Sequence, residues 1–198
     1  MTSPRPLPAA VAQLLERRRL KWPEALPWVA ALLVYAFLPQ YLPLGSQILI
    51  MVLFALSLDL VLGYAGVVTL GHAAFYGIGA YTAGLLAVNG WNEPLSGLVI
   101  AALTAAAVGI VAGSVILRTA ELALLMLTMA LALILFEMSN RLHWLTGGFD
   151  GLQGIVMQPI LGRYEFDFFG ETAFLYCLAV LFVVWIFMRQ LVNAPVAE

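Results

Sequence analysis

Long uncharged apolar runs are the feature that most restricts how this chain can fold. No residue from Ala25 to Leu58 carries a charge, and a second uncharged run extends from Leu60 to Asn92. A membrane-spanning helix needs about 20 mostly apolar residues, because the hydrocarbon core is about 30 Å thick and each helical residue rises about 1.5 Å. The first run is long enough for two such helices, and the second holds at least one more.

The overall composition agrees with a membrane environment. Of the 198 residues, 63% are hydrophobic and 10% are charged, and the mean hydropathy is +0.99. Soluble domains carry about 25% charged residues, so this chain has too little polar surface to cover a globule. A formal net charge of -2 also provides no basic surface for a nucleic acid. We therefore predict an all-α, polytopic transmembrane helix bundle that contacts the lipid bilayer.

Turn-forming residues divide the apolar runs into about six spans. Pro39, Pro43 and Gly45 separate the first two, and Gly63 to Gly66 offer a turn before the third, because proline removes a donor and glycine loosens the backbone. The long loop, residues 141–171, precedes the last span. The predicted spans are 26–42, 46–62, 67–88, 95–117, Glu121 to Asn140, and Thr172 to Met188.

The distribution of basic residues predicts the orientation. Residues 1–24 form an arm with five of the nine basic residues, so the positive-inside rule makes this arm cytoplasmic. Alternation through six spans then places Arg118 and Arg189 inside and the acidic long loop outside. We therefore expect residues 25–198 to form the transmembrane domain, with both termini cytoplasmic.

Several kinds of chemistry lack the residues that they require. The only lysine, Lys21, does not follow the glycines of a phosphate-binding loop, so ATP hydrolysis would need a separate subunit. No G-x-S-x-G motif is present for a serine hydrolase. His72 and His143 are far apart in sequence, and Cys177 is the single cysteine, which gives no metal-binding spacing. We expect no catalytic residues, metal or cofactor.

Small residues follow a helical spacing in and before the third span. Close approach of helices at small residues is a main way in which helices associate in lipid. Leucine in place of Gly77 is therefore expected to wedge the bundle apart. The predicted packing stripe consists of Gly66, Ala73, Gly77, Ala80 and Gly84.

Three ionisable residues lie at or near membrane depth, where an unpaired charge is costly. Glu137 precedes Arg141 by four residues, the spacing of a helical ion pair. For Asp59, both interfacial capping and a role in a polar pathway remain open. His72 is better explained as a hydrogen-bonded histidine than as a proton relay, because a relay needs several ionisable partners.

Two motifs resemble the membrane permeases of ABC importers for branched-chain amino acids. The first is GYAGVVTLGHAAFYGIGAY at residues 63–81, and the second is TGGFDGLQGI at residues 146–155. The resemblance covers approximately Leu56 to Arg189. It implies a bacterial inner-membrane permease that pairs with a second permease subunit, cytoplasmic ATPase subunits and an extracytoplasmic substrate-binding protein. A urea or short-chain amide importer is the alternative within this class.

The chain departs from the family pattern at a few places. Thr69 replaces a usual serine, and Asp59 replaces a common asparagine. Relatives continue beyond the equivalent of Glu198 through a cytoplasmic coupling segment and further spans. We therefore expect this chain to be the N-terminal portion of a permease, as a truncated product, half of a split permease, or a scaffold fragment that does not transport. Even with the ATPase, companion permease and binding protein, it is not expected to support ATP-dependent uptake unless a separate polypeptide supplies the missing half.

The resemblance also suggests two groups of candidate site residues. The first would line the substrate pathway and comprises Asp59, Thr69, His72, Tyr76 and Tyr81. The second lies in the long loop and comprises Thr146, Gly147, Gly148, Asp150 and Gly151. Glycines here, with Gly154, permit left-handed backbone conformations. We expect a compact surface element beside a docking site for the binding protein, with simple turn structure as the alternative.

Overall fold

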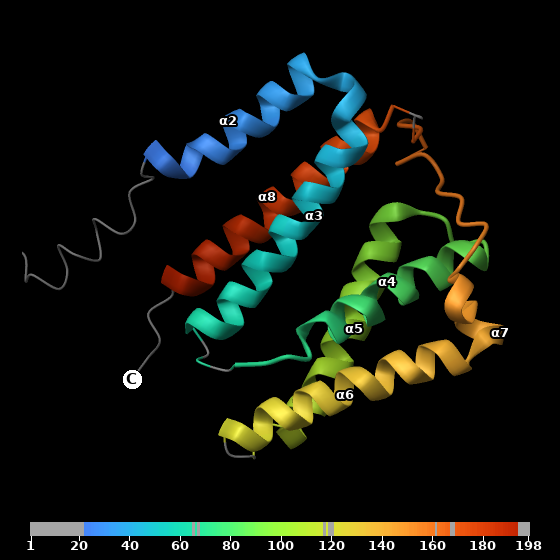
Figure 1. The fold of residues 1–198 in the computed structure, drawn as a ribbon. Helices are drawn as coiled ribbons and strands as arrows, with labels where there is room; N and C mark the ends of the chain where they lie inside the picture. Colours follow the sequence, from blue (N-terminus) through green and yellow to red (C-terminus); the bar gives the residue numbers. More distant parts are fainter. Residues whose placement is uncertain are drawn as a thin grey trace, which may run out of the picture. The chain divides into compact units, whose positions relative to one another are not determined.

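The computed structural model describes residues 22–64, 66, 68–116, 118, 121–160, 162–166 and 169–193. Within these residues the fold is helical and contains no strand beyond one isolated bridge. The six main helices are α2 (Trp22–Phe37), α3 (Leu42–Asp59), α4 (His72–Val88), α5 (Pro94–Ile116), α6 (Glu121–Arg141) and α8 (Glu171–Asn193) (Figure 1). They follow the order of the six predicted spans. Most of the predicted basic arm lies outside the described residues.

Four segments are long and apolar enough to cross a membrane by themselves. These segments are Pro39–Tyr64, Pro94–Ser114, Leu122–Arg141 and Glu171–Val192. Helices α2 and α4 are also apolar, but they have only 16 and 17 residues. The chain is thus an all-α, multi-pass membrane protein, as its composition predicts.

The connection between α3 and α4 differs most from the sequence prediction. α3 continues into a π-helical turn, η2 (Leu60–Tyr64), and α4 begins only at His72 instead of near residue 67. Gly66 has a φ of 65°, a left-handed conformation that glycine adopts without strain. The residues just before α4 are therefore non-helical although they are apolar, and Val68 and Leu70 are exposed.

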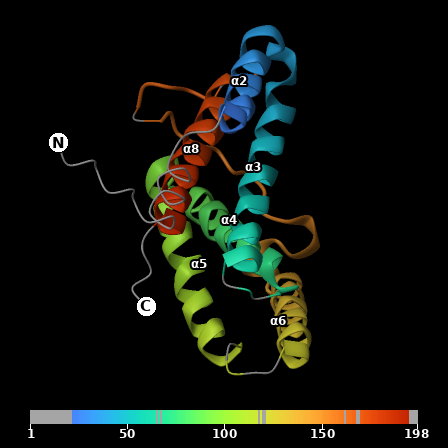
Figure 2. The same cartoon turned by 90° about the vertical axis from the view of Figure 1, so that its left-hand side faces the viewer.

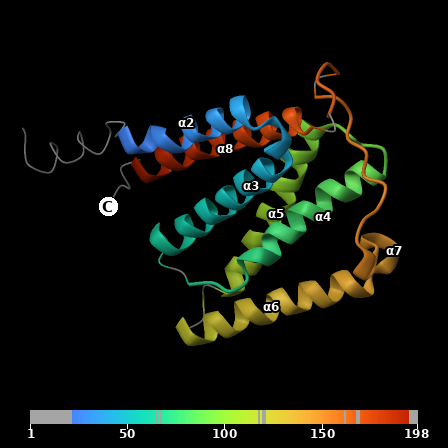
Figure 3. The ribbon, with the colours of Figure 1, turned by 45° about the horizontal axis from the view of Figure 1, so that its top comes forward.

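The first of two compact units contains α2, the start of α3, and α8, which follows α2 side by side (Figure 3). Its core includes Leu42 and Phe174, which are 0% and 2% exposed. A β-carbon placed on Gly45 would lie 2.8 Å from the Phe174 ring, so this glycine lets the ring approach α3 closely. The ring of Trp28 meets that of Phe182 edge-on at 5.1 Å, which joins α2 to α8.

The second unit, Met51–Phe168, contains α4 between α5 and α6 (Figure 2). α4 packs most extensively against α5. A β-carbon on Gly79 would lie 3.9 Å from the Ala101 carbonyl oxygen, and one on Gly109 would lie 3.9 Å from the Phe75 ring. These close approaches at Ala101 and Gly109 belong to a series of small residues that recur every four positions along α5. They are Gly97, Ala101, Ala105 and Gly109.

The predicted ion pair at the end of α6 is confirmed. The Nε atom of Arg141 lies 2.7 Å from Oε1 of Glu137, and both side chains are well exposed. An exposed pair of this kind contributes little to stability. It does account for Glu137 without assigning that residue a role in transport.

Candidate functional site

The predicted pathway residues divide between two sides of α4. His72 and Tyr81 are nine positions apart, and at about 100° per residue they point in opposite directions. His72 and Tyr76 face α3, where both rings contact Phe54 at centroid distances of 5.2 and 5.7 Å. Tyr81 instead lines a cavity beside α6. The structure therefore does not gather these residues into one wall.

His72 is held by a serine on α3. The Ser57 hydroxyl oxygen lies 2.7 Å from His72 Nε2 and 2.8 Å from the carbonyl oxygen of Phe54. A hydroxyl has one hydrogen, so Ser57 donates to the carbonyl and accepts a hydrogen bond from the protonated Nε2 of His72. This geometry agrees with the interpretation of His72 as a hydrogen-bonded histidine, and it joins the start of α4 to α3.

Hydroxyl groups also hold the non-helical residues before α4. The Leu70 N–H donates to Thr128 Oγ1 at 3.2 Å, and the Gly71 N–H donates to Thr69 Oγ1 at 3.1 Å. Thr128 belongs to α6, is 4% exposed, and donates its own proton to the Leu125 carbonyl. Lipid offers no hydrogen bonds to a backbone that leaves the helix, so these side chains take over that task.

Asp59 stands apart from the other predicted pathway residues. It is the last residue of α3, its side chain is exposed, and it makes no hydrogen bond to the described residues. A β-carbon on Gly63, in the following π-helical turn, would lie 3.6 Å from its Oδ1. Both interpretations of Asp59 remain predictions.

A cavity of about 590 Å³ lies between α4 and α6, with the short helix α7 (His143–Thr146) at one end. We name it the α4–α6 cavity. Small residues of α4 make the space, because a β-carbon on Gly77 would meet no atom within 4 Å. Apolar side chains such as Ile78, Leu133 and Phe136 form most of its wall. The polar residues that line it are Tyr81, Thr82, Ser139, Asn140 and Thr146.

Asn140 is the most buried of the polar side chains in this cavity that lack a hydrogen-bond partner among the described residues. The residue is 9% exposed, and its side chain makes no hydrogen bond to any residue that the structure describes. Among the described residues, the only enclosed side-chain atom without a partner is Asn92 Oδ1, so the amide of Asn140 keeps access to the cavity. Thr146 differs, because its hydroxyl contacts the Ser139 and Leu142 carbonyls and accepts from the Gly148 N–H.

Glycines shape the first part of the long loop, which the structure places at residues 142–170. Gly147, Gly148, Gly151 and Gly154 all have positive φ values, as predicted. A β-carbon on Gly147 would overlap the Gly151 carbonyl, and one on Gly148 would overlap the His143 ring. The chain therefore forms a compact turn through α7 and the 3-10 helix η3 (Gly148–Asp150). Asp150 is exposed and makes no hydrogen bond to the described residues.

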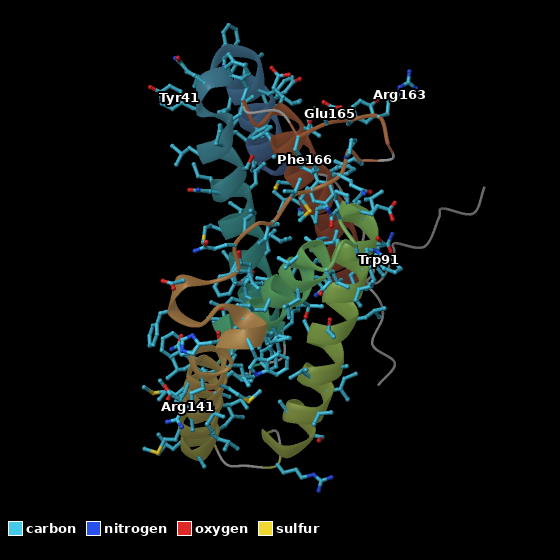
Figure 4. The ribbon with its side chains drawn as sticks, turned by 90° about the vertical axis from the view of Figure 1, so that its right-hand side faces the viewer. Tyr41, Trp91, Arg141, Arg163, Glu165 and Phe166 are labelled. Carbon is cyan, nitrogen blue, oxygen red and sulfur yellow. The ribbon has the colours of Figure 1, made fainter. Side chains whose placement is uncertain are left out.

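The remainder of the long loop lies along the end of α4. Leu152 approaches within 2.8 Å of a β-carbon placed on Gly84, so this member of the predicted stripe accommodates the loop. The Gln158 N–H donates to the Asn92 carbonyl oxygen at 3.0 Å. Farther along, a tight turn carries Arg163, whose side chain projects away from the ribbon (Figure 4).

The other members of the predicted packing stripe also have distinct positions. Gly66 precedes α4, Ala80 is exposed, and Ala73 and Gly77 line the α4–α6 cavity. Gly79 is not among the predicted packing residues, although the small residues at every fourth position of α5 indicate a close helix contact. Ser57, Thr128 and Asn140 are not among the predicted site residues either, since only tertiary structure shows what these polar residues face.

Comparison with known proteins identifies the family. Residues 41–191 match the family described as branched-chain amino acid transport system / permease component. The high-affinity branched-chain amino acid transport system permease protein LivM of Salmonella typhimurium is 31% identical over 166 residues, covering 71% of this chain and 38% of LivM. LivM of Escherichia coli is 31% identical over 165 residues, with the same coverage.

This chain therefore spans less than half the length of these relatives. No solved structure matches it. The matched region nevertheless includes five of the six main helices and the long loop. The chain belongs to the branched-chain amino acid transport system permease family.

Proposed function

We propose that this chain acts within the permease subunit of an ABC-type importer for branched-chain amino acids. The family match over residues 41–191 is the observation that carries this proposal. Both LivM relatives have names that describe high-affinity transport of branched-chain amino acids. The chain would form part of the substrate pathway, and alternating access would carry the amino acid inward.

The partners follow from the same proposal. A second permease subunit would complete the pathway, and separate cytoplasmic subunits would hydrolyse ATP. The sequence supports this division, because its only lysine, Lys21, lies outside any phosphate-binding motif. An extracytoplasmic binding protein would deliver the substrate.

We also propose the orientation and the docking surface. Residues 1–24 would be a cytoplasmic arm, and residues 25–198 would form a transmembrane domain in the bacterial inner membrane with both termini inside. The long loop would then face the binding protein. Its Trp144 and Phe149 are each 82% exposed, and aromatic side chains are enriched in protein interfaces.

Uptake in a strain that lacks its own branched-chain amino acid importers tests the function. The chain is expressed with its binding protein, companion permease and ATPase subunits, together with a separate polypeptide that supplies the part of the LivM relatives that this chain does not cover. Accumulation of labelled leucine is then measured. We expect ATP-dependent uptake that isoleucine and valine inhibit and urea does not. Uptake of urea without uptake of leucine would overturn the substrate assignment, and a level equal to the empty vector for both would overturn the transport role.

A further inference from the structure

We infer that the α4–α6 cavity binds one amino acid with an aliphatic side chain, and that Asn140 forms a hydrogen bond to its charged backbone groups. This inference rests on the proposed function and adds a location for the substrate. It assigns the site to the side of α4 that carries Gly77 and Tyr81, whereas His72 and Tyr76 contact α3.

The size and lining of the cavity fit a small, mostly apolar molecule. Its volume of about 590 Å³ lies within the range of small-molecule sites, which are commonly apolar with a few polar groups that fix orientation. Ile78 and Leu85 of α4 and Leu133 and Phe136 of α6 supply apolar walls for an aliphatic side chain. Gly77 keeps the space between them open.

Asn140 supplies the chemistry that recognises an amino acid. A side-chain amide both donates and accepts, so it can donate to a carboxylate or accept from an ammonium group. The side chain is 9% exposed, and in the described part of the chain it has no partner. Because the amide keeps access to the cavity, a ligand there can form hydrogen bonds with it directly.

The absence of charge from the cavity wall limits the ligand further. Among the described residues that line the cavity, none is Asp, Glu, Lys, Arg or His. A ligand with a net charge would lose its hydration without gaining a counter-charge, whereas a zwitterion is neutral overall. Leucine, isoleucine and valine therefore fit, while lysine and glutamate do not. Urea lacks the apolar body that would contact most of the wall.

Equilibrium dialysis of the full chain in lipid nanodiscs, with radiolabelled leucine as the probe, tests this site. Two variants address it separately, because Asn140→Leu removes the hydrogen bond and Gly77→Val places a branched side chain in the space. Asn89→Leu is the control, since this asparagine is exposed at the end of α4 and does not line the cavity. Thermal unfolding confirms that each variant is folded.

We expect isoleucine and valine, but not lysine, glutamate or urea, to displace leucine. Asn140→Leu should raise the Kd for leucine about tenfold or more, the loss expected for a hydrogen bond to a charged group. Gly77→Val should also raise the Kd for leucine because it narrows the cavity, and Asn89→Leu should leave the Kd unchanged. An unchanged leucine Kd in both cavity variants would overturn the inference, and so would the absence of any leucine binding.

A lipid acyl chain is the competing occupant, and photolabelling distinguishes it. A diazirine analogue of leucine should label peptides from α4 and α6, and excess leucine should prevent this. Labelling of the same peptides by a diazirine lipid that leucine does not displace would overturn the inference.

Uptake measurements test the proposed function separately from the binding site. If both cavity variants take up leucine with unchanged KM and kcat, the inferred site is wrong but the transport function stands. If leucine binds at the cavity but no uptake occurs, the inferred site stands and the transport function is wrong.

Discussion

The hydrogen bond between Ser57 and His72 joins α3 to the first residue of α4. Replacing Ser57→Ala leaves the imidazole N–H without its partner and should lower the free energy of unfolding by about 1 kcal/mol, as for other hydrogen bonds within membranes. Denaturant titration in mixed micelles measures this change. Ser57→Thr keeps the hydroxyl and serves as the control. Equal losses in the two variants would mean that packing, and not the hydrogen bond, matters here.

Gly77 and Gly79 lie two positions apart but have opposite surroundings. Gly79→Leu would press against α5 near Ala101 and should cost about 1–3 kcal/mol, typical of overpacking. Gly77→Leu meets open space and should change unfolding much less, contrary to the expectation from sequence that it would wedge the bundle apart. The same micelle titration compares the two variants. A larger loss for Gly77→Leu would contradict the arrangement of α4 between α5 and the cavity.

Residue identity alone predicted some of these roles and not others. The spacing of Glu137 and Arg141 within one helix was sufficient to predict their ion pair. Ser57, Thr128 and Asn140 gave no such signal, because their partners or spaces are created by helices that meet in three dimensions. His72 was predicted to be hydrogen-bonded because the sequence lacks the several ionisable partners that a proton relay needs. The sequence did not identify Ser57 as its partner.

At the scale of elements, charge-free runs and proline placement predicted all six main helices in order. The start of α4 was the main error. Residues around Val68 and Leu70 are as apolar as a helix interior, so hydropathy places them in the span. The positive φ of Gly66 and the side-chain hydrogen bonds at Leu70 and Gly71 show a different backbone path. Hydropathy does not distinguish an apolar helix from an apolar extended segment.

Thr128 is expected to stabilise the start of α4 from the neighbouring α6. Thr128→Val removes the acceptor of the partly buried Leu70 N–H and should lower the free energy of unfolding by about 1 kcal/mol, the typical net contribution of one hydrogen bond. Hydrogen–deuterium exchange at residues 69–71 should accelerate in the same variant. Thr128→Ser keeps the acceptor and should behave as the parent chain. Unchanged exchange in Thr128→Val would show that this bond does not hold the segment.

The compact turn of the long loop depends on Gly147. A β-carbon there would overlap the Gly151 carbonyl, so Gly147→Ala must open the turn. We expect faster hydrogen–deuterium exchange across residues 143–151. Gly154→Ala is the matched control, because its φ is also 76° but its β-carbon would meet nothing within 4 Å. Similar exchange in both variants would mean that backbone strain, rather than the close approach, determines the effect.

At the scale of the whole molecule, the proposed orientation is open to direct labelling. After Cys177→Ala, a Phe149→Cys variant should react with a membrane-impermeant maleimide from the outer side. Arg118→Cys, in the link between α5 and α6, should react only in inverted vesicles. Both positions are exposed, so access alone does not separate them. The opposite pattern would reverse the assignment of both termini to the cytoplasm.

The unequal lengths of α4 and α5 make this protein sensitive to the thickness of its bilayer. α4 has 17 residues and extends for about 26 Å, whereas α5 has 23 residues and extends for about 34 Å. One helix is therefore shorter and the other longer than a typical hydrocarbon thickness of about 30 Å. A thicker membrane would draw the non-helical residues before α4 into hydrocarbon, where Thr128 and Thr69 accept from the amides of Leu70 and Gly71. Lipids with shorter acyl chains would leave this segment outside the hydrocarbon. The thickness of the bilayer would therefore determine the stability of the junction between α3, α4 and α6.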